Sequence, residues 1–304
     1  MRPAPDETRQ KIRFRSGGVD CAAWHYPGRD GTCVVMAGGF AVTKEPATDL
    51  FARRLHEAGF GVLAFDYRRL GESGGSPRQL VRIREQLADW QAAIEYAATM
   101  PGVDPARIAV WGFSASGGHV FRVAARNPQL AAAIAQTPNA GGPAASRAAL
   151  RHQTTGALLR LTARGLRDAI GGVLGRPPLL VPLGGKPGTV AVLTTPDVAD
   201  TQRALDPEGR YPDWQQQVAA RSVLRLSVYR PGRSAARIRC PLLVVVCEAD
   251  QSAYPPAALQ AARRVPNAEV VELPGGHYAP FLDAHEQAVE AEVTFLSLHL
   301  RAGR

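Results

Sequence analysis

The sequence has few cysteines, and their spacing fits neither a zinc site nor a redox pair. The four are Cys21, Cys33, Cys240 and Cys247, and no two of them form a C-x-x-C motif. Cys33 and Cys247 lie within apolar runs that are typical of buried strands. This pattern predicts buried free thiols in a reducing compartment.

Long apolar runs are also missing. No stretch reaches the ~18 uninterrupted apolar residues that a membrane-spanning helix needs. Residues 1–10 are polar and contain Pro3, Pro5, Asp6 and Glu7, so they lack the apolar segment of a secretory signal. We therefore expect a cytoplasmic protein without a membrane span.

Lysine is scarce, so the basic charge comes almost wholly from arginine. Of 36 basic residues only Lys11, Lys44 and Lys186 are lysines, and with 27 acidic residues the formal net charge is +9. The arginines form no basic tail, zinc-finger or RNP pattern, which argues against nucleic acid as a partner. The glycine-rich stretches match no phosphate loop or dinucleotide fingerprint, and the histidines have no metal-ligand spacing. We expect no cofactor and no metal.

What is present is the patterning of a globular α/β protein. The chain has 304 residues, 45% hydrophobic and 21% charged, with a mean hydropathy of -0.13. Short apolar runs alternate with stretches at helical spacing, which predicts a parallel sheet covered by helices on both faces. The expected strands span residues 33–36, 61–67, 108–113, 130–136, 241–246 and 269–273, and the expected helices 48–58, 80–100, 116–127, 256–264 and 284–300.

The alternation stops between residues 139 and 238. There, glycine and proline pairs are interleaved with amphipathic stretches such as residues 157–173 and 214–226. A structureless segment of this length is improbable inside a compact domain, so we expect a mostly helical insertion. The predicted domains are a core of residues 1–138 and 239–304 and a lid of residues 139–238.

Residues 112–118 (GFSASGG) stand where a predicted strand passes into a predicted helix. A serine on such a turn has a strained backbone, so the residues two before and two after it must be small. Gly112 and Ser116 meet this requirement around Ser114, although Ser116 replaces the glycine of the usual G-x-S-x-G pattern. If the motif is read two residues later, with its last glycine at Gly118, Ser116 is the alternative nucleophile. In the non-catalytic interpretation, the serine only caps the next helix. We prefer Ser114 because Gly112 comes just after the apolar strand and leaves Ser114 at the sharp turn.

A catalytic serine needs a histidine to accept its proton and a carboxylate to orient that histidine. Asp250 follows one predicted strand and His277 follows the next, so both would lie at the carboxyl edge of the sheet, where active sites of open sheets gather. Glu248 is the alternative acid, and an ordinary loop role stays open for both Asp250 and His277. His119, on the predicted helix after Ser114, is expected to pack between helices instead.

Three motifs of the chain resemble those of the α/β-hydrolase fold serine hydrolases, of the esterase, thioesterase and dienelactone-hydrolase-like kind. Residues 66–74 (DYRRLGESG) resemble a loop of that superfamily, with Arg69 where the family often has glycine. Residues 112–119 resemble a variant of its nucleophile elbow. Residues 275–281 (GGHYAPF) resemble its histidine loop, with Ala279 where an aspartate is common.

The resemblance implies a mostly parallel eight-stranded sheet with helices on both faces and a helical lid insertion. It assigns Ser114 as nucleophile, His277 as base and Asp250 as orienting acid. It further implies an oxyanion hole made of the backbone N–H groups of Ala115 and Phe40, with Ala41 as the alternative to Phe40.

The predicted lid contains two sets of residues that could bear on the substrate. Its apolar residues suggest an acyl pocket for an apolar or bulky substrate: Leu158, Leu166, Val173, Leu174, Leu179 and Leu180. Its arginines form part of a helical stripe that could attract a coenzyme A thioester, an acyl carrier protein or a membrane surface: Arg147, Arg151, Arg160, Arg164 and Arg167. A solvated helix face is the preferred interpretation of that stripe.

These observations together predict a hydrolase that cleaves a carboxylic ester, thioester or lactone through an acyl-enzyme on Ser114. The same triad could instead serve an acyltransferase, a cyclising enzyme of secondary metabolism or a peptidase. A non-catalytic binding module is a further alternative. The sequence identifies neither the acyl substrate nor the oligomeric state.

Overall fold

The computed structural model describes residues 8–301. Most of the polar start that argues against a secretory signal, residues 1–7, lies outside the described residues. Within the described part, no helix is both long and apolar enough to cross a bilayer. The four cysteines are buried and unpaired, as predicted, and burial raises the pKa of the Cys33 thiol to about 12.

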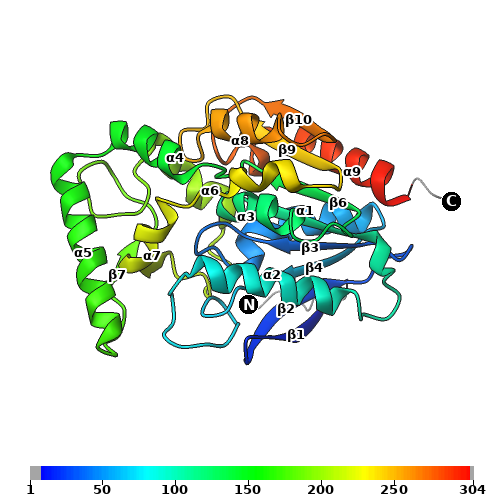
Figure 1. Cartoon of the computed structure of the whole chain (residues 1–304), viewed down its shortest axis with the longest axis horizontal. Helices are drawn as coiled ribbons and strands as arrows, with labels where there is room; N and C mark the ends of the chain where they lie inside the picture. Colours follow the sequence, from blue (N-terminus) through cyan, green and yellow to red (C-terminus); the bar gives the residue numbers. More distant parts are fainter. Residues whose placement is uncertain (1–7, 302–304) are drawn as a thin grey trace.

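An eight-stranded sheet in the order β1-β2-β4-β3-β5-β6-β9-β10 forms the centre of the molecule (Figure 1). β1 pairs with β2, and β2 with β4, in antiparallel fashion, whereas all other neighbours are parallel. This confirms the predicted mostly parallel sheet of eight strands. The strands are β1 (Gln10–Ser16), β2 (Val19–Tyr26), β3 (Cys33–Ala37), β4 (Gly61–Phe65), β5 (Ile108–Phe113), β6 (Ala132–Gln136), β9 (Leu242–Cys247) and β10 (Ala268–Leu273).

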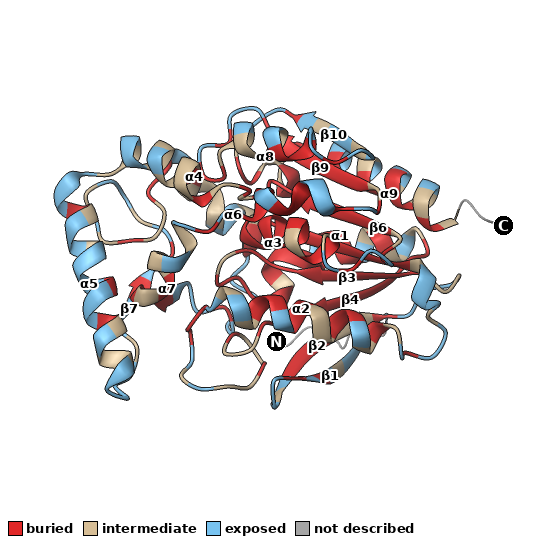
Figure 2. Cartoon of the chain, in the orientation of Figure 1, coloured by how far each residue is buried: buried red, intermediate tan, exposed pale blue. Residues whose placement is uncertain are grey.

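Helices cover both faces of this sheet. α1 packs beside α9, and α2 packs beside α3. Because both faces are covered, every residue of β3, β4, β5, β6 and β9 is buried, and Figure 2 shows this buried centre. The helices of the core are α1 (Lys44–Glu57), α2 (Ile83–Ala97), α3 (Ala115–Ala124), α8 (Pro255–Ala262) and α9 (His285–Arg301), with short 3-10 turns η1 (Pro105–Arg107) and η5 (Ala279–Phe281).

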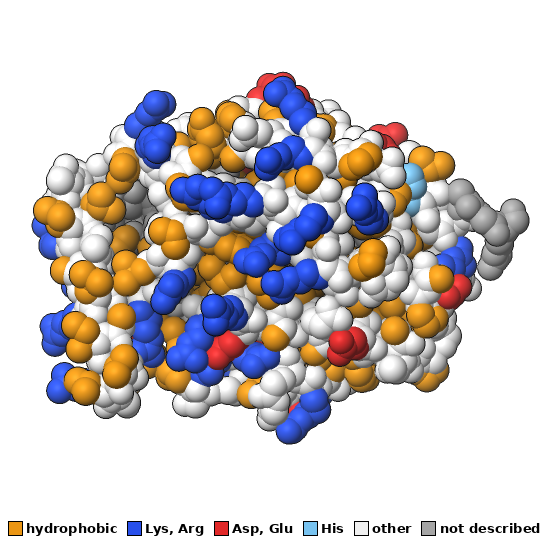
Figure 3. All heavy atoms as spheres, viewed as in Figure 1, with side chains coloured by type: hydrophobic (Ala, Val, Ile, Leu, Met, Phe, Trp, Pro, Cys, Tyr) orange, Lys and Arg blue, Asp and Glu red, His pale blue; other side chains and the backbone are white. Residues whose placement is uncertain are grey.

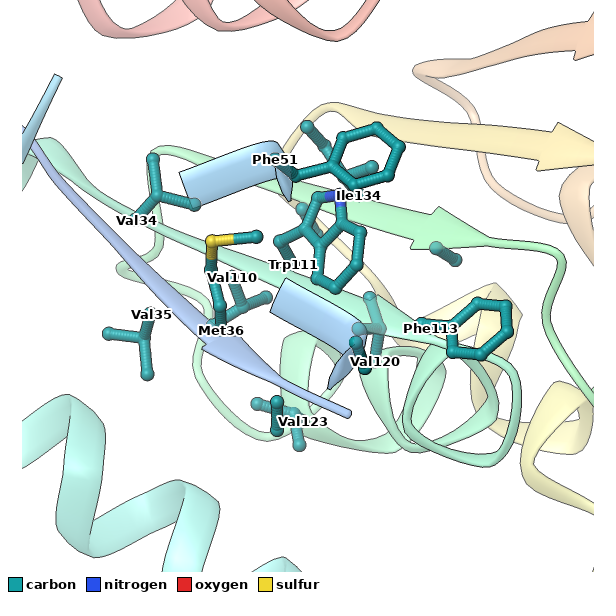
Figure 4. Packing of buried hydrophobic residues seen from close by; sticks show 14 of the residues in the cluster. Val34, Val35, Met36, Phe51, Val110, Trp111, Phe113, Val120, Val123 and Ile134 are labelled. Carbon is teal, nitrogen blue, oxygen red and sulfur yellow. The ribbon is translucent and has the colours of Figure 1, made fainter. Parts of the chain in front are cut away.

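The packing of the central strands follows their alternation. Met36 of β3 pairs in register with Trp111 of β5, and the ring of Phe51 from α1 lies 5.3 Å from the Trp111 ring between centroids (Figure 4). Val35 and Val110 also pair in register and point to the opposite face. The sheet therefore has an apolar core on each side, which fixes the positions at which its strands end.

Two helices of the core differ from the predicted ranges at their starts. α1 begins at Lys44, four residues before the expected start, because a proline such as Pro46 is tolerated in the first turn of a helix. α2 begins at Ile83 instead of at residue 80. The backbone N–H of Val81 donates to the Ser222 hydroxyl at 3.0 Å, so the preceding stretch stays extended against the insertion.

The N-terminal hairpin is an element that the sequence interpretation did not include. β1 and β2 are joined by Gly17 and Gly18, which have φ of 54° and 78°. Two consecutive glycines of positive φ form the tight turn that matches the twist of paired strands. This Gly-Gly pair between alternating apolar residues is the signal that could have revealed the hairpin.

The segment between β6 and β9 contains helices together with a small antiparallel sheet of β7 and β8. The stretch at residues 214–226 is a strand followed by a helix rather than one amphipathic helix, because Val218 is buried in a pair with Val181. The elements are α4 (Gly142–Ala149), η2 (Leu150–His152), α5 (Thr155–Val173), β7 (Leu180–Pro182), η3 (Pro196–Asp200), α6 (Thr201–Leu205), β8 (Gln217–Ala219), α7 (Ala220–Leu226) and η4 (Pro231–Arg237).

Candidate active site

Ser114 lies on the turn between β5 and α3, and its backbone is strained. Its φ and ψ are 57° and −113°, a region that costs a non-glycine residue about 1–3 kcal/mol. Three hydrogen bonds hold the turn: Ser114 N–H donates to Gln136 O, and the Ser114 carbonyl accepts from the N–H groups of Gly118 and Asn139, each at 2.9 Å. The turn therefore projects the serine side chain beyond the carboxyl edge of the sheet.

The glycines around Ser114 are required by close contacts between backbone segments. A Cβ atom at Gly112 would lie 2.5 Å from the carbonyl oxygen of Ser116. A Cβ atom at Gly118 would lie 2.3 Å from the carbonyl oxygen of Asn139. Neither carbonyl can move without shifting the main chain, so both positions need glycine.

Ser116 replaces the second glycine of the usual elbow and has its own structural partners. Its hydroxyl is buried, lies 2.5 Å from the Tyr67 hydroxyl and donates to the carbonyl oxygen of Gly38. The Tyr67 hydroxyl also accepts from the indole N–H of Trp90 at 2.7 Å. The Ser116 side chain thus joins the elbow to the end of β3 and to α2.

The three side chains singled out in the sequence meet at the edge of the sheet. The Ser114 hydroxyl lies 3.0 Å from Nε2 of His277, and Nδ1 of His277 lies 2.7 Å from Oδ2 of Asp250. The other Asp250 oxygen accepts from the N–H groups of Ser252 and Ala253 at 2.8 Å each. The hydrogen bonds to Asp250 fix the carboxylate, which in turn fixes the imidazole with Nε2 toward the serine.

The charges around His277 favour its protonated form. Burial alone would lower the pKa of the imidazole, but the Asp250 carboxylate at Nδ1 and the nearby charge of Asp197 together outweigh that effect, so the pKa of His277 is raised above its ordinary value. Glu248, the alternative acid, is exposed and is not the partner of Nδ1.

The two proposed oxyanion donors lie on the loops that flank Ser114. Ala115 is the first residue of α3, so its N–H has no partner within the helix. Phe40 follows Gly39, at which a Cβ atom would lie 3.4 Å from Cβ of Ser114. Across residues 8–301 no backbone acceptor takes the N–H of Phe40. Within the described residues, neither N–H group therefore has a backbone partner, and an oxyanion donor must have none.

Asp197, in η3 of the insertion, is a buried carboxylate that the sequence interpretation missed. One oxygen accepts from the backbone N–H of His277 at 3.2 Å. The other accepts from the backbone N–H of Gln251 at 3.0 Å and from the Ser252 hydroxyl at 2.8 Å. Asp197 therefore ties the insertion to both loops that present Asp250 and His277. No motif or periodicity marks this residue in the sequence.

A buried charge cluster explains the loop at residues 66–74. Asp66 accepts from the backbone N–H of Lys44 at 2.7 Å, from the Lys44 ammonium at 3.0 Å and from Glu72 N–H at 3.0 Å. Burial raises the pKa of Asp66 despite this cation. Arg69, at the position where the family often has glycine, has a φ of 72° and bonds Glu85 at 2.8 Å. The ion pair offsets part of the strain that glycine would avoid.

His119 is buried between helices, as predicted. Its ring nitrogens lie 2.9 Å from the Tyr229 hydroxyl and 3.0 Å from the Gln86 side-chain oxygen. Burial and the nearby Arg122 lower the pKa of His119 to about 3, so the ring is neutral. Among residues 8–301, no three His, Cys, Asp or Glu side chains are grouped to hold a metal ion.

The apolar residues expected to line an acyl pocket lie mostly at the surface instead. Val173 is 88% exposed and Leu166 is 54% exposed, and Leu174, Leu179 and Leu180 are exposed as well. α5 buries Ala157, Gly165 and Asp168, whereas Leu158 and Leu161 are half-buried and its other large apolar residues are exposed. The arginine stripe of the insertion is also exposed, as expected of a solvated face: Arg147, Arg151, Arg160, Arg164 and Arg167.

A largely parallel sheet in this strand order, with a serine on the turn after β5, defines the α/β-hydrolase class of proteins. Residues 34–292 match the model of the family described as "Alpha/beta hydrolase family". The chain belongs to this family.

Comparisons with known proteins agree with this membership. The quorum-quenching protein AidA of Acinetobacter baumannii (strain MDR-ZJ06) is 38% identical over 290 residues, which cover 94% of this chain and 93% of that protein. A thiohydrolase of Eupenicillium brefeldianum is 28% identical over 175 residues, which cover 57% and 54% of the two chains. The crystal structure of the α/β hydrolase GrgF from Penicillium sp. sh18 has a TM-score of 0.80 at 22% identity, over 96% of this chain and 99% of that one. At this identity the GrgF structure shows a shared fold.

Proposed function

We propose that the protein is a serine hydrolase that cleaves a carboxylic ester, thioester or lactone. The observation that supports this most directly is the hydrogen-bonded series from the Ser114 hydroxyl through His277 to Asp250, with distances of 3.0 and 2.7 Å. The geometry is the one in which an imidazole can take the proton of a serine hydroxyl while a carboxylate holds the ring.

In the proposed reaction, Nε2 of His277 removes the Ser114 proton as Oγ attacks the substrate carbonyl carbon. The resulting oxyanion is stabilised by the N–H groups of Ala115 and Phe40, each contributing on the order of 3 kcal/mol. The protonated imidazole gives its proton to the leaving alcohol or thiol, and an acyl-enzyme remains. Water then attacks the acyl carbon with His277 again as base, which releases the acid and restores Ser114.

We further propose that the substrate is a small acyl compound and that the insertion acts as a lid over it. A relative named as a thiohydrolase supports a thioester as one of the candidate substrates. The acyl group could arrive as a free ester or lactone, or as a thioester of coenzyme A or of an acyl carrier protein. The bond between Asp197 of the insertion and the His277 loop supports a lid that is part of the active enzyme.

The test is a panel of acyl p-nitrophenyl esters, acyl coenzyme A species and lactones, run on wild type, Ser114→Ala and Ser116→Ala. We expect the wild type to turn over at least one class and Ser114→Ala to lose about a thousandfold or more of that activity. A fluorophosphonate probe should label Ser114 in the wild type and in Ser116→Ala. Full activity of Ser114→Ala, or labelling of another serine, would overturn the proposal.

A further inference from the structure

The surface of the protein has a large groove, and none of the proposed catalytic residues lines it. It has a volume of about 1390 Å³ and is bounded by the start of α2, the end of α3, the end of α5, α7 and η4. Figure 3 shows basic side chains, coloured blue, gathered around an apolar hollow, and the basic residues that line the groove are all arginines. The groove is therefore a second concave surface with its own chemistry.

The charge on its walls is almost entirely positive. Eight arginines and one acid, Glu85, line the groove. Glu85 is already bonded to Arg69 at 2.8 Å and to Arg82 at 3.1 Å. Six of the arginines have no carboxylate within 4.0 Å in the part of the chain that the structure describes: Arg84, Arg122, Arg225, Arg230, Arg233 and Arg237.

The positive charge of these unpaired arginines favours the binding of an anion in the groove. Guanidinium groups that face one another across a groove repel, and a bound anion with several acceptor oxygens relieves that repulsion. The arginines come from four different elements, so one phosphate could not contact them all. The ligand that suits this arrangement presents at least two phosphate groups close together.

The apolar residues that line the groove restrict the class of ligand that fits it. Leu80, Ile83 and Leu224 line it, and the Arg122 guanidinium lies 5.7 Å from the centre of the Tyr229 ring. An apolar floor below a cationic rim suits a molecule that joins phosphates to an apolar or ring-shaped part. A recess of this volume admits a small soluble molecule, whereas a flat bilayer would reach only the rim.

We propose that this arginine groove binds a soluble small ligand that contains two or more neighbouring phosphate groups, of the kind found in nucleotides and in coenzyme A. This binding site is separate from Ser114 and does not depend on the reaction proposed for it.

The experiment measures binding by calorimetry to the Ser114→Ala protein, so that no turnover interferes. The probes are inorganic pyrophosphate and coenzyme A, each at low and at high NaCl concentration. The test variant is Arg225→Gln with Arg233→Gln, and the matched control is Arg263→Gln with Arg264→Gln, two exposed arginines after α8 that lie outside the groove. We expect the test pair to weaken coenzyme A binding by about tenfold or more and the control pair by less than about twofold. Added NaCl should also weaken binding.

A second measurement does not rely on folded variants. Phenylglyoxal labelling of the unaltered protein, read by mass spectrometry, should spare Arg225 and Arg233 when coenzyme A is present and should leave Arg263 equally labelled. The proposal is overturned if neither probe binds at millimolar concentration, or if the two variant pairs lose affinity equally. Binding only to phosphatidylglycerol vesicles, or only to an oligonucleotide, would also overturn it.

Discussion

Replacing Asp197 by asparagine should impair catalysis even though Asp197 touches neither the serine hydroxyl nor the imidazole ring. The carboxylate accepts three hydrogen bonds, from His277 N–H at 3.2 Å, Gln251 N–H at 3.0 Å and the Ser252 hydroxyl at 2.8 Å. An asparagine has the same shape but only one acceptor oxygen. Whichever way the amide turns, its NH2 group must face at least one donor that Asp197 satisfied.

The magnitude follows from those contacts. An unsatisfied buried donor costs about 1–3 kcal/mol, and asparagine leaves at least one such donor, so the free energy of unfolding should fall by at least about 1–3 kcal/mol. The loop that presents His277 would shift, and a displacement near 1 Å can reduce the rate about a hundredfold. Removal of the negative charge of Asp197 should also lower the pKa of His277, because that charge favours the imidazolium.

The assay is the pH dependence of kcat and kcat/KM on whichever ester, thioester or lactone the wild type accepts. Asp197→Asn should show a kcat at least about tenfold lower and an acidic limb displaced to lower pH, since His277 acts as base only when neutral. Asp200→Asn is the matched control, because Asp200 lies in the same turn and, among residues 8–301, forms an ion pair only with Arg203, at 3.2 Å on the surface. If Asp197→Asn kept the wild-type kcat and the wild-type acidic limb, the positioning role would be refuted.

Three further predictions concern stability. Gly118→Ala should lower the free energy of unfolding by about 1–3 kcal/mol in urea titrations, since its Cβ would lie 2.3 Å from the Asn139 carbonyl; an unchanged midpoint would contradict the contact. Lys44→Met should cost about 3–5 kcal/mol in the same assay, because Asp66 would be left buried without its cation; a loss below about 1 kcal/mol would count against this. Burial raises the pKa of Glu292 to about 8 from an ordinary value near 4.5, so the wild type should lose about 1.4 kcal/mol per pH unit between those values, whereas Glu292→Gln should not. Thermal unfolding should find the two proteins alike near pH 4 and the variant more stable at pH 9, and parallel curves would disprove the buried proton.

The residues at the ends of the strands could be predicted because their signal is local. Ser114 comes directly after the buried strand β5, and Asp250 lies three residues after the buried strand β9. His277 lies four residues after β10, which is shorter on apolar residues and largely exposed, and parallel strands bring their carboxyl ends to one edge. Asp197 has no such signal. Its partners Gln251 and His277 come 54 and 80 residues later, so only the folded insertion brings them to it.

The helix α5 of the insertion shows that hydrophobic spacing in the sequence predicts a helix without predicting which of its faces is buried. The spacing in residues 157–173 correctly predicts the helix α5, but it does not say which face of that helix is buried. Gly165 lies against Leu224, because a Cβ atom placed at Gly165 would come within 3.1 Å of the Leu224 side chain. Asp168 accepts hydrogen bonds from the backbone N–H groups of Leu179 and Arg221. Small size and hydrogen bonding, rather than apolar character, decide which side of α5 packs inward.

If the insertion acts as the proposed lid, its attachments would link access to Ser114 with the state of His277. Asp197 is one of several attachments of the insertion to the core. Others are the buried Gln79, whose side-chain N–H donates to the carbonyls of Gln215 and Gln217 at 3.0 and 2.8 Å, and the bond from Val81 N–H to Ser222 at 3.0 Å. If the whole insertion moved away as one body, these attachments would break, and the His277 loop would lose its carboxylate partner. Such an opening would loosen the imidazole and lower its pKa at the moment the substrate entered. An opening that leaves η3 in place would keep Asp197 bonded to the His277 loop and the imidazole aligned with Ser114. The triad would then be ready to react while the insertion is still open, whereas after a movement of the whole insertion it would be ready only once the insertion had closed again.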